Sequence, residues 1–184
     1  MMAVSASFRT GLLESVPSLR AFAISLIGSA ERADDLVQET LMKAWSKSDS
    51  FQEGTNLNAW LFTILRNEYY SQMRKRGREI QDSDGFYAER LAVHPSQHGH
   101  MDMTDFRSAL DTLPDDQREA LILVGASGFS YEEAAEICGC AVGTIKSRVS
   151  RARTRLAELL DLEAEAEIGP DAVAESAMEL TSKP

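Results

Sequence analysis

Apolar residues recur every three or four positions along most of the chain, and no stretch alternates as a half-buried strand would. This spacing predicts an all-α protein. In the first half it predicts helices over about 6–27, 31–47 and 57–76, with a short turn near 51–56 before the last helix. The helix over 31–47 has an acidic, polar face and an opposite apolar stripe, which comprises Leu36, Val37, Thr40, Leu41, Ala44 and Trp45.

The helix over 57–76 carries its own start and stop signals. Asn56 suits the N-cap position that precedes it. At the other end, the cations at 74–76 favour the negative end of the helix dipole, and Gly77 can stop the helix. The pattern therefore predicts a helix that ends at residue 76. Its inward side comprises Leu57, Trp60, Leu61, Ile64, Leu65 and, by preference, Tyr69.

Beyond residue 76 the periodicity disappears until about residue 103, and glycine and proline punctuate this polar segment. We interpret 77–103 as a flexible linker between two small helical domains, 7–76 and 104–160. Residues 161–184 are acidic and rich in alanine, without a sustained apolar face, and are interpreted as a tail. In the second domain the pattern predicts helices that begin near Met103 and that cover about 114–126, 130–138 and 142–160.

Residues 130–155 read SYEEAAEICGCAVGTIKSRVSRARTR, which matches the requirements of a helix-turn-helix. Ser130 and Glu133 form a capping box at the start of the first helix, and Gly139 can adopt the positive φ of the tight turn. The inward face of the second helix comprises Val142, Ile145 and Val149. Its outward face then presents Thr144, Lys146, Ser147, Arg148, Arg151 and Arg155.

Such a helix suits the DNA major groove, where polar residues near its start read base edges and arginines hold phosphates. The alternative is a basic amphipathic helix that merely faces solvent. A capping box, small residues, a turn glycine and an acid-free basic face occur here in the order that a helix-turn-helix needs. This order favours DNA binding.

The formal net charge of −10 is unevenly distributed along the chain. Residues 1–76 carry a net charge of +1, 77–103 carry −3, 104–160 carry −2 and 161–184 carry −6. Within 144–155 there are five basic residues and no acidic one. The second helix of the helix-turn-helix, which we call the recognition helix, therefore has the local charge of a phosphate binder, although the protein as a whole is acidic.

Other classes of function lack support in the sequence. There is no nucleophile–base set, no phosphate-binding glycine loop and no paired inward carboxylates, so we predict that the chain is not an enzyme. The three histidines lie together in the linker, and a metal site that they would share with Cys138 and Cys140 is disfavoured because it needs fixed geometry. Cys138 is instead expected to be a small buried residue and Cys140 a turn residue. We predict no metal and no cofactor.

Apolar runs such as that at 121–126 fall far short of the about 20 residues that span a bilayer. The only two cysteines form a C-x-C pair, which cannot staple distant parts of a fold. These features predict a soluble, cytoplasmic protein that does not bind a membrane.

Three blocks make the sequence resemble the extracytoplasmic-function sigma factors, which consist of sigma region 2, a short linker and sigma region 4. They are DDLVQETLMKAW at 34–45, NAWLFTILRNEYYSQMRKR at 58–76 and LPDDQREALILVGASGFSYEEAAEICGCAVGTIKSRVSRAR at 113–153. The resemblance covers about residues 7–160. It implies that 7–76 is region 2, that 104–160 is region 4, and that the chain directs RNA polymerase core to promoters, with its helix-turn-helix on the −35 element.

The resemblance also implies roles for region 2. Its acidic helix would dock on the clamp helices of the polymerase largest subunit through Asp35, Gln38 and Glu39, although these residues alone would pass for a solvated face. The loop at 51–56 and the helix after it would open and read the −10 element. The candidates for this −10 contact are Asn56, Asn67, Tyr70, Arg74 and Lys75.

Within the family, the runs ICGCAVGTIKSRVSRAR and LVGASGFSYEEAAEICG look most like the alphaproteobacterial general-stress sigma factors. This likeness implies control by a small anti-sigma factor of the NepR type, which a phosphorylated response regulator of the PhyR type would remove. Two alternatives remain: a helix-turn-helix regulator that works without polymerase, and a sigma-like mimic that sequesters an anti-sigma factor.

Overall fold

The computed structural model describes residues 5–82 and 103–160 of the chain. All regular elements within these two ranges are helical, as the apolar spacing predicts. The predicted tail, most of the linker and the three linker histidines lie outside them. The elements are α1 (Ala6–Ile27), α2 (Ala30–Ser46), the 3-10 turn η1 (Ser48–Ser50), α3 (Leu57–Asp82), α4 (Met103–Thr112), α5 (Asp115–Gly125), α6 (Tyr131–Cys138) and α7 (Val142–Leu159).

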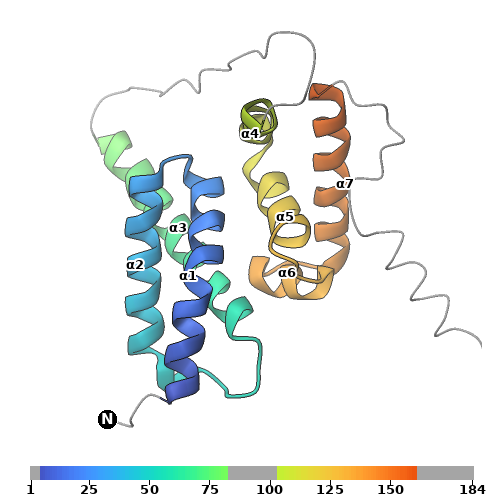
Figure 1. Ribbon diagram of the computed structural model, residues 1–184. Helices are drawn as coiled ribbons and strands as arrows, with labels where there is room; N and C mark the ends of the chain where they lie inside the picture. The colour runs from blue at the N-terminus through green and yellow to red at the C-terminus, as the bar shows by residue number, and fades with distance from the viewer. Residues whose placement is uncertain (1–4, 83–102, 161–184) are drawn as a thin grey trace, which may run out of the picture.

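Helices α1, α2 and α3 pack together as the first lobe (Figure 1). The turn between α1 and α2 is short because Gly28, with φ of 76°, ends α1 in the left-handed conformation and Ser29 caps α2. The predicted N-cap of α3 is confirmed, since the Asn56 side-chain oxygen accepts a hydrogen bond from the Ala59 amide at 3.1 Å. The lobe core is built around Leu19, Phe22, Leu36, Leu61, Phe62, Leu65 and Tyr69.

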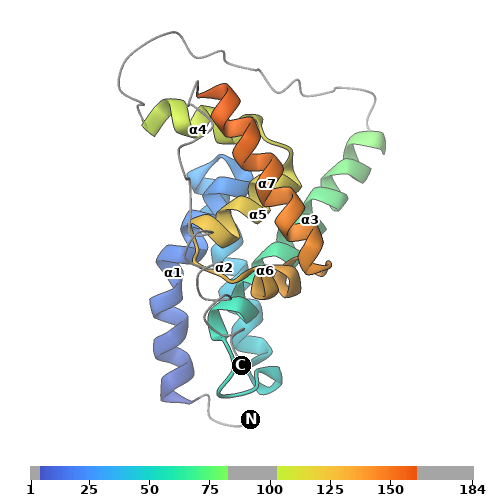
Figure 2. The same ribbon diagram turned by 90° about the vertical axis from the view of Figure 1, so that its right-hand side faces the viewer.

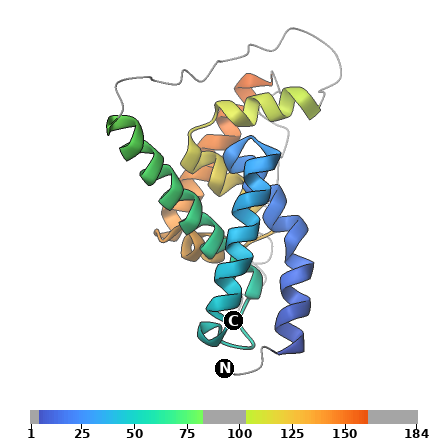
Figure 3. The ribbon, with the colours of Figure 1, turned by 90° about the vertical axis from the view of Figure 1, so that its left-hand side faces the viewer.

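Helix α3 does not end at Gly77, contrary to the prediction, and continues to Asp82. Its C-terminal half projects away from the other helices (Figures 2 and 3). Gly77 is exposed, a Cβ added to it would meet nothing within 4 Å, and its φ is not in the left-handed region, so the backbone continues as a helix. A glycine inside a helix costs only about 1 kcal/mol relative to alanine, which the helix tolerates.

Helices α4 to α7 form the second lobe, in which α5 and α6 both contact α7. The predicted capping box is present, because the Ser130 hydroxyl accepts from the Glu133 amide at 3.1 Å and the Glu133 carboxylate accepts from the Ser130 amide at 2.9 Å. Gly139 ends α6 with φ of 64°, as the tight turn requires. The helix-turn-helix predicted from the sequence is therefore confirmed in its geometry.

The Ser130→Ala variant is expected to lose about 1 kcal/mol of unfolding free energy, because the first turn of α6 loses one side-chain acceptor. Urea denaturation measures this loss. Ser150→Ala on the exposed face of α7 is the matched control and should leave the midpoint unchanged. Equal midpoints for the two variants would contradict a stabilising role for the cap.

The two lobes pack directly against each other. Phe62 of α3 stacks on Phe22 of α1 and meets Phe129, which precedes α6, edge to face; both ring-centroid distances are 4.9 Å. Helix α1 also contacts α5, and α3 contacts α6. One apolar cluster therefore runs through both lobes, a feature that the sequence analysis did not predict.

Among the described helices, α1 alone is long and apolar enough, by length and composition, to cross a membrane. The sequence analysis had not singled it out. In the structure its apolar side packs into the lobe core through Phe8, Leu12, Leu19, Phe22 and Leu26. Helix α1 thus has the burial of a core helix. A core helix can meet the same criteria of length and composition as a membrane-spanning helix.

Candidate nucleic-acid interface

The recognition helix α7 has the inward seam that the sequence predicts. Ile145 and Val149 are completely buried, with exposed fractions of 0% and 1%, and Val142 is half-buried. Because these three positions face α5 and α6, the residues between them must point outward. Figure 1 shows α7 on the side of the second lobe that is remote from α2.

The six predicted −35 residues all have some access to solvent. Thr144, Lys146, Arg151 and Arg155 are exposed, whereas Ser147 and Arg148 are half-buried. The Lys146 ammonium lies 5.7 Å from the centre of the Tyr131 ring, and Arg155 pairs with Glu158 one turn further along α7. Pairs as exposed as Arg155–Glu158 contribute little and give way readily to a phosphate.

Arg148 of this helix is held by contacts within the second lobe. Its Nε lies 3.0 Å from an Asp116 carboxylate oxygen on α5, and its side chain is only 23% exposed. A terminal nitrogen of the same guanidinium lies 3.9 Å from the Cys140 sulfur. The predicted outward face is therefore present, but its Arg148 is already held in place by an acid of another helix of the same lobe.

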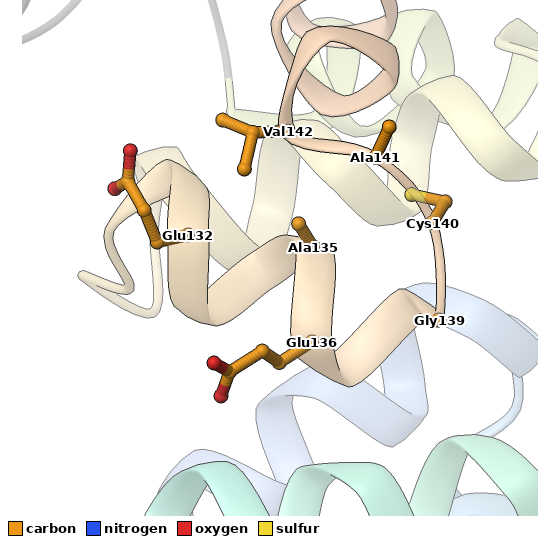
Figure 4. Close-up of a pocket in the computed structure, with 7 residues that line it drawn as sticks. All are labelled: Glu132, Ala135, Glu136, Gly139, Cys140, Ala141 and Val142. Carbon is orange, nitrogen blue, oxygen red and sulfur yellow. The ribbon is translucent and has the colours of Figure 1, made fainter.

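The turn before α7 is an open groove lined by Glu132, Ala135, Glu136, Gly139, Cys140, Ala141 and Val142 (Figure 4). Cys138 is buried behind this turn, as predicted, and burial together with nearby Glu119 raises the pKa of its thiol to about 12. Cys138 is therefore a protonated thiol at neutral pH. Within residues 5–82 and 103–160, no three His, Cys, Asp or Glu side chains are grouped to hold a metal ion.

Two of the predicted −10 residues are in contact with the second lobe. The Asn56 amide nitrogen donates to a Glu133 carboxylate oxygen at 2.7 Å, and the Tyr70 hydroxyl donates to Glu119 at 3.3 Å. Asn67, Arg74 and Lys75 are exposed on α3. The structure thus places all five candidates on α3 or immediately before it; four of them are exposed, whereas Tyr70 is half-buried.

An ion pair across the lobes was missed by the sequence analysis. The Arg66 Nε of α3 lies 2.8 Å from a Glu119 carboxylate oxygen of α5, whose side chain is completely buried. Burial raises the pKa of Glu119, while Arg66 and the Tyr70 hydroxyl act in the opposite direction. The Arg66 guanidinium also lies over the Tyr70 ring, 4.7 Å from its centre. No sequence signal could have found this pair, since its residues belong to different helical patterns.

The predicted polymerase-docking residues lie on a separate surface. Asp35, Gln38 and Glu39 are exposed on α2, and Glu39 accepts a hydrogen bond from the Gln72 amide at 2.8 Å. Elsewhere on α2, Lys43 pairs with Glu68 of α3. Together, Asp35, Gln38 and Glu39 form one solvent-facing polar strip on α2.

Trp45 is not part of the buried stripe of α2, contrary to the prediction. Its side chain is 47% exposed and lines a shallow apolar groove between α1 and α2, together with Arg9, Leu12, Leu13 and Leu41. The remaining positions of the stripe are buried or half-buried. Helical spacing identified the apolar face of α2 correctly, but it could not show that Trp45 would line an open groove beside α1 and stay partly exposed.

Comparison with known families matches Sigma-70 region 2 over residues 12–79 and Sigma-70 region 4 over residues 103–156. The chain is 63% identical over 170 residues to the ECF RNA polymerase sigma factor EcfG of Rhodopseudomonas palustris (strain TIE-1). This match covers 92% of this chain and 94% of the relative. The chain therefore belongs to the extracytoplasmic-function sigma factors of RNA polymerase. Within that class its sequence is similar to EcfG.

Solved structures agree with this assignment. The sigma factor RpoE of Bartonella quintana, in complex with the anti-sigma factor NepR, has a TM-score of 0.76 and 66% identity, covering 86% of this chain and 99% of RpoE. The PhyRSL–NepR complex of Sphingomonas sp. Fr1 matches with a TM-score of 0.61 and 21% identity, over 85% of this chain and 91% of the other. The second match shows a shared fold alone.

Proposed function

We propose that this sigma factor directs RNA polymerase core to specific promoters in the cytoplasm and performs no chemistry of its own. The observation that carries the proposal is the outward basic face of α7, which contains no acid over residues 144–155 and is oriented by the buried Ile145 and Val149. In this account 7–76 is region 2, 77–103 is the linker and 104–160 is region 4. Any nucleotide polymerisation belongs to the partner enzyme, so no cofactor is required of this chain.

The proposed division of labour follows the three surfaces of the described residues. Asp35, Gln38 and Glu39 contact the clamp helices of the polymerase. Region 4 reads the −35 duplex with Thr144, Lys146, Ser147, Arg148, Arg151 and Arg155. Region 2 captures the unpaired −10 strand with Asn56, Asn67, Tyr70, Arg74 and Lys75, because cations track phosphates and an aromatic ring stacks on a base.

The likeness to EcfG and to the NepR-bound RpoE supports a more specific role. We infer that a NepR-type anti-sigma factor inhibits this chain, and that a PhyR-type response regulator releases it in the general stress response. The fold shared with the sigma-like part of PhyR supports the release step, since two proteins of one fold can offer one inhibitor similar surfaces.

Reconstituted transcription tests the proposed function. Purified core polymerase, the chain and a genomic promoter library should give discrete transcripts that disappear when a NepR-type protein is added. A helix-turn-helix regulator would not bind core polymerase, and a sigma mimic would bind the anti-sigma factor without yielding promoter-directed transcripts. Either of those results would overturn the proposal.

The Asp35→Lys variant is expected to bind core polymerase about tenfold more weakly, because a like charge then faces a basic partner. Asp35 is exposed, so circular dichroism should show an unchanged fold. Glu14→Lys, an equal change of charge on exposed α1, is the control and should retain wild-type affinity in a fluorescence titration. Equal affinity of Asp35→Lys and wild type would remove the clamp-helix contact.

A further inference from the structure

An acid of α5 pairs with a cation on the outward face of α7. One of the Asp116 carboxylate oxygens lies 3.0 Å from the Arg148 Nε. The Asp116 side chain is 49% exposed and that of Arg148 is 23% exposed, so the pair lies at the surface of the second lobe. Helices α5 and α7 pack directly against each other, which keeps the carboxylate next to the guanidinium.

The contacts of Arg148 differ from those of Lys146 on the same face. A terminal nitrogen of the Arg148 guanidinium lies 3.9 Å from the Cys140 sulfur, so the group is held on two sides. The Lys146 ammonium instead lies 5.7 Å from the centre of the Tyr131 ring. The charge of Arg148 is therefore offset by a carboxylate, whereas Lys146 meets an aromatic ring.

The carboxylate changes which DNA groups Arg148 can bind favourably. A phosphate bound to the Arg148 guanidinium would also lie near the Asp116 carboxylate. Two like charges about 4 Å apart repel each other by about 1 kcal/mol in bulk water and by about 4 kcal/mol near a protein surface. The acceptors on base edges in the major groove, such as guanine O6 and N7, carry no net charge. Asp116 therefore disfavours a phosphate at Arg148 much more than a base edge.

We propose that Asp116 is a positioning residue that determines specificity, because it reserves Arg148 for base edges of the −35 duplex. This inference rests on the proposed function, which takes α7 to be the −35 helix. A guanidinium that Asp116 already holds loses little side-chain entropy when it meets a base. Arg148 then contributes to discrimination between sequences, and other cations of the face, such as Lys146 and Arg151, supply the attraction to phosphates.

Three substitutions separate this role from a merely structural one. Asp116→Asn removes the charge but retains a side chain of nearly the same size with an oxygen acceptor. Asp116→Glu retains the charge and is the conservative variant. Asp111→Asn is the matched control, because Asp111 is an exposed acid of the same lobe whose carboxylate pairs with Arg118 instead.

Holoenzyme made from core polymerase and the full-length chain is titrated with two duplexes, a promoter recovered from the transcription assay and the same promoter with a scrambled −35 element. Asp116→Asn should bind the scrambled duplex about tenfold more tightly than wild type, because Arg148 can then hold a phosphate. The salt slope of that binding should become steeper by about one unit. The ratio of the two affinities should fall about tenfold, whereas Asp116→Glu and Asp111→Asn should keep the wild-type ratio.

A double-mutant comparison shows whether Asp116 acts through Arg148. In an Arg148→Ala background, Asp116→Asn should leave the affinity ratio and the salt slope unchanged. Asp116 also lies in the first turn of α5, where an acid favours the helix N-terminus. Loss of that structural role alone would lower the free energy of unfolding, which urea denaturation measures, without changing the salt slope.

Two results would overturn the proposal. One is an affinity ratio and a salt slope that Asp116→Asn leaves at their wild-type values, and the other is an equal change with and without Arg148. Failure of the proposed function gives a different pattern. In that case the wild-type chain would form no holoenzyme that distinguishes the two duplexes, and it would yield no promoter-directed transcript.

Discussion

Replacing Lys146 or Arg148 with alanine should weaken binding to the −35 duplex about ten- to a hundredfold, which corresponds to about 1–3 kcal/mol for a base or phosphate contact. Lys146 is exposed on the outward face of α7. Arg148 is held by Asp116 at 3.0 Å, so little side-chain entropy is lost when it meets DNA. In each variant, −35-dependent transcription should fall together with the affinity for the −35 duplex.

Gel-shift titrations at several salt concentrations, on a promoter recovered from the transcription assay, measure this effect. A phosphate contact that is lost should also reduce the salt slope by about one unit. Arg107 is an exposed arginine of α4, so Arg107→Ala is the charge-matched control. It should leave the affinity for the duplex and its salt slope unchanged. Unchanged promoter occupancy in the Lys146 and Arg148 variants would refute the assignment of α7 as the −35 helix.

Replacing Phe62 with alanine should lower the free energy of unfolding by about 3–5 kcal/mol, the usual cost of removing a buried aromatic ring. Phe62 is 1% exposed and lies between the Phe22 and Phe129 rings. Its removal therefore leaves a cavity in the first lobe and also deletes the aromatic contact with the second.

Chemical denaturation followed by fluorescence and circular dichroism tests this expectation. Phe62→Leu, which retains most of the buried volume, should lose less than half as much stability. Trp60 lies near Phe8 and Phe51 at the other side of the first lobe, so its fluorescence reports the unfolding of region 2. A loss below about 1 kcal/mol for Phe62→Ala would mean that this ring is not buried between the lobes.

The helix-turn-helix was predictable because its signals are local. The Ser130–Glu133 capping box, Gly139 in the left-handed region and the buried Ile145 and Val149 all follow from residues within about one helical turn of each other. The burial of Tyr69 and Cys138 was likewise predicted from helical spacing and residue size, and both are buried.

Features that depend on distant parts of the chain were not predictable in the same way. Gly77 has the composition of a helix stop, but local preference cannot tell whether the helix continues through an exposed glycine. Trp45 has the spacing of a core residue, and only the position of α1 shows that it is exposed. The Arg66–Glu119 pair joins two separate hydrophobic patterns, so it required the tertiary structure. The proposed DNA and polymerase contacts stay predictions.

The Arg66–Glu119 pair also has a consequence for protein engineering. A chimera that joins region 2 of one sigma factor to region 4 of another would take the two residues of this pair from different parents. A donor region 4 with an apolar residue at the position of Glu119 would leave the Arg66 charge without its acid, and the reverse exchange would bury a carboxylate alone. Hybrids in this family should therefore be designed with both positions taken from the same parent, as a unit that spans the junction.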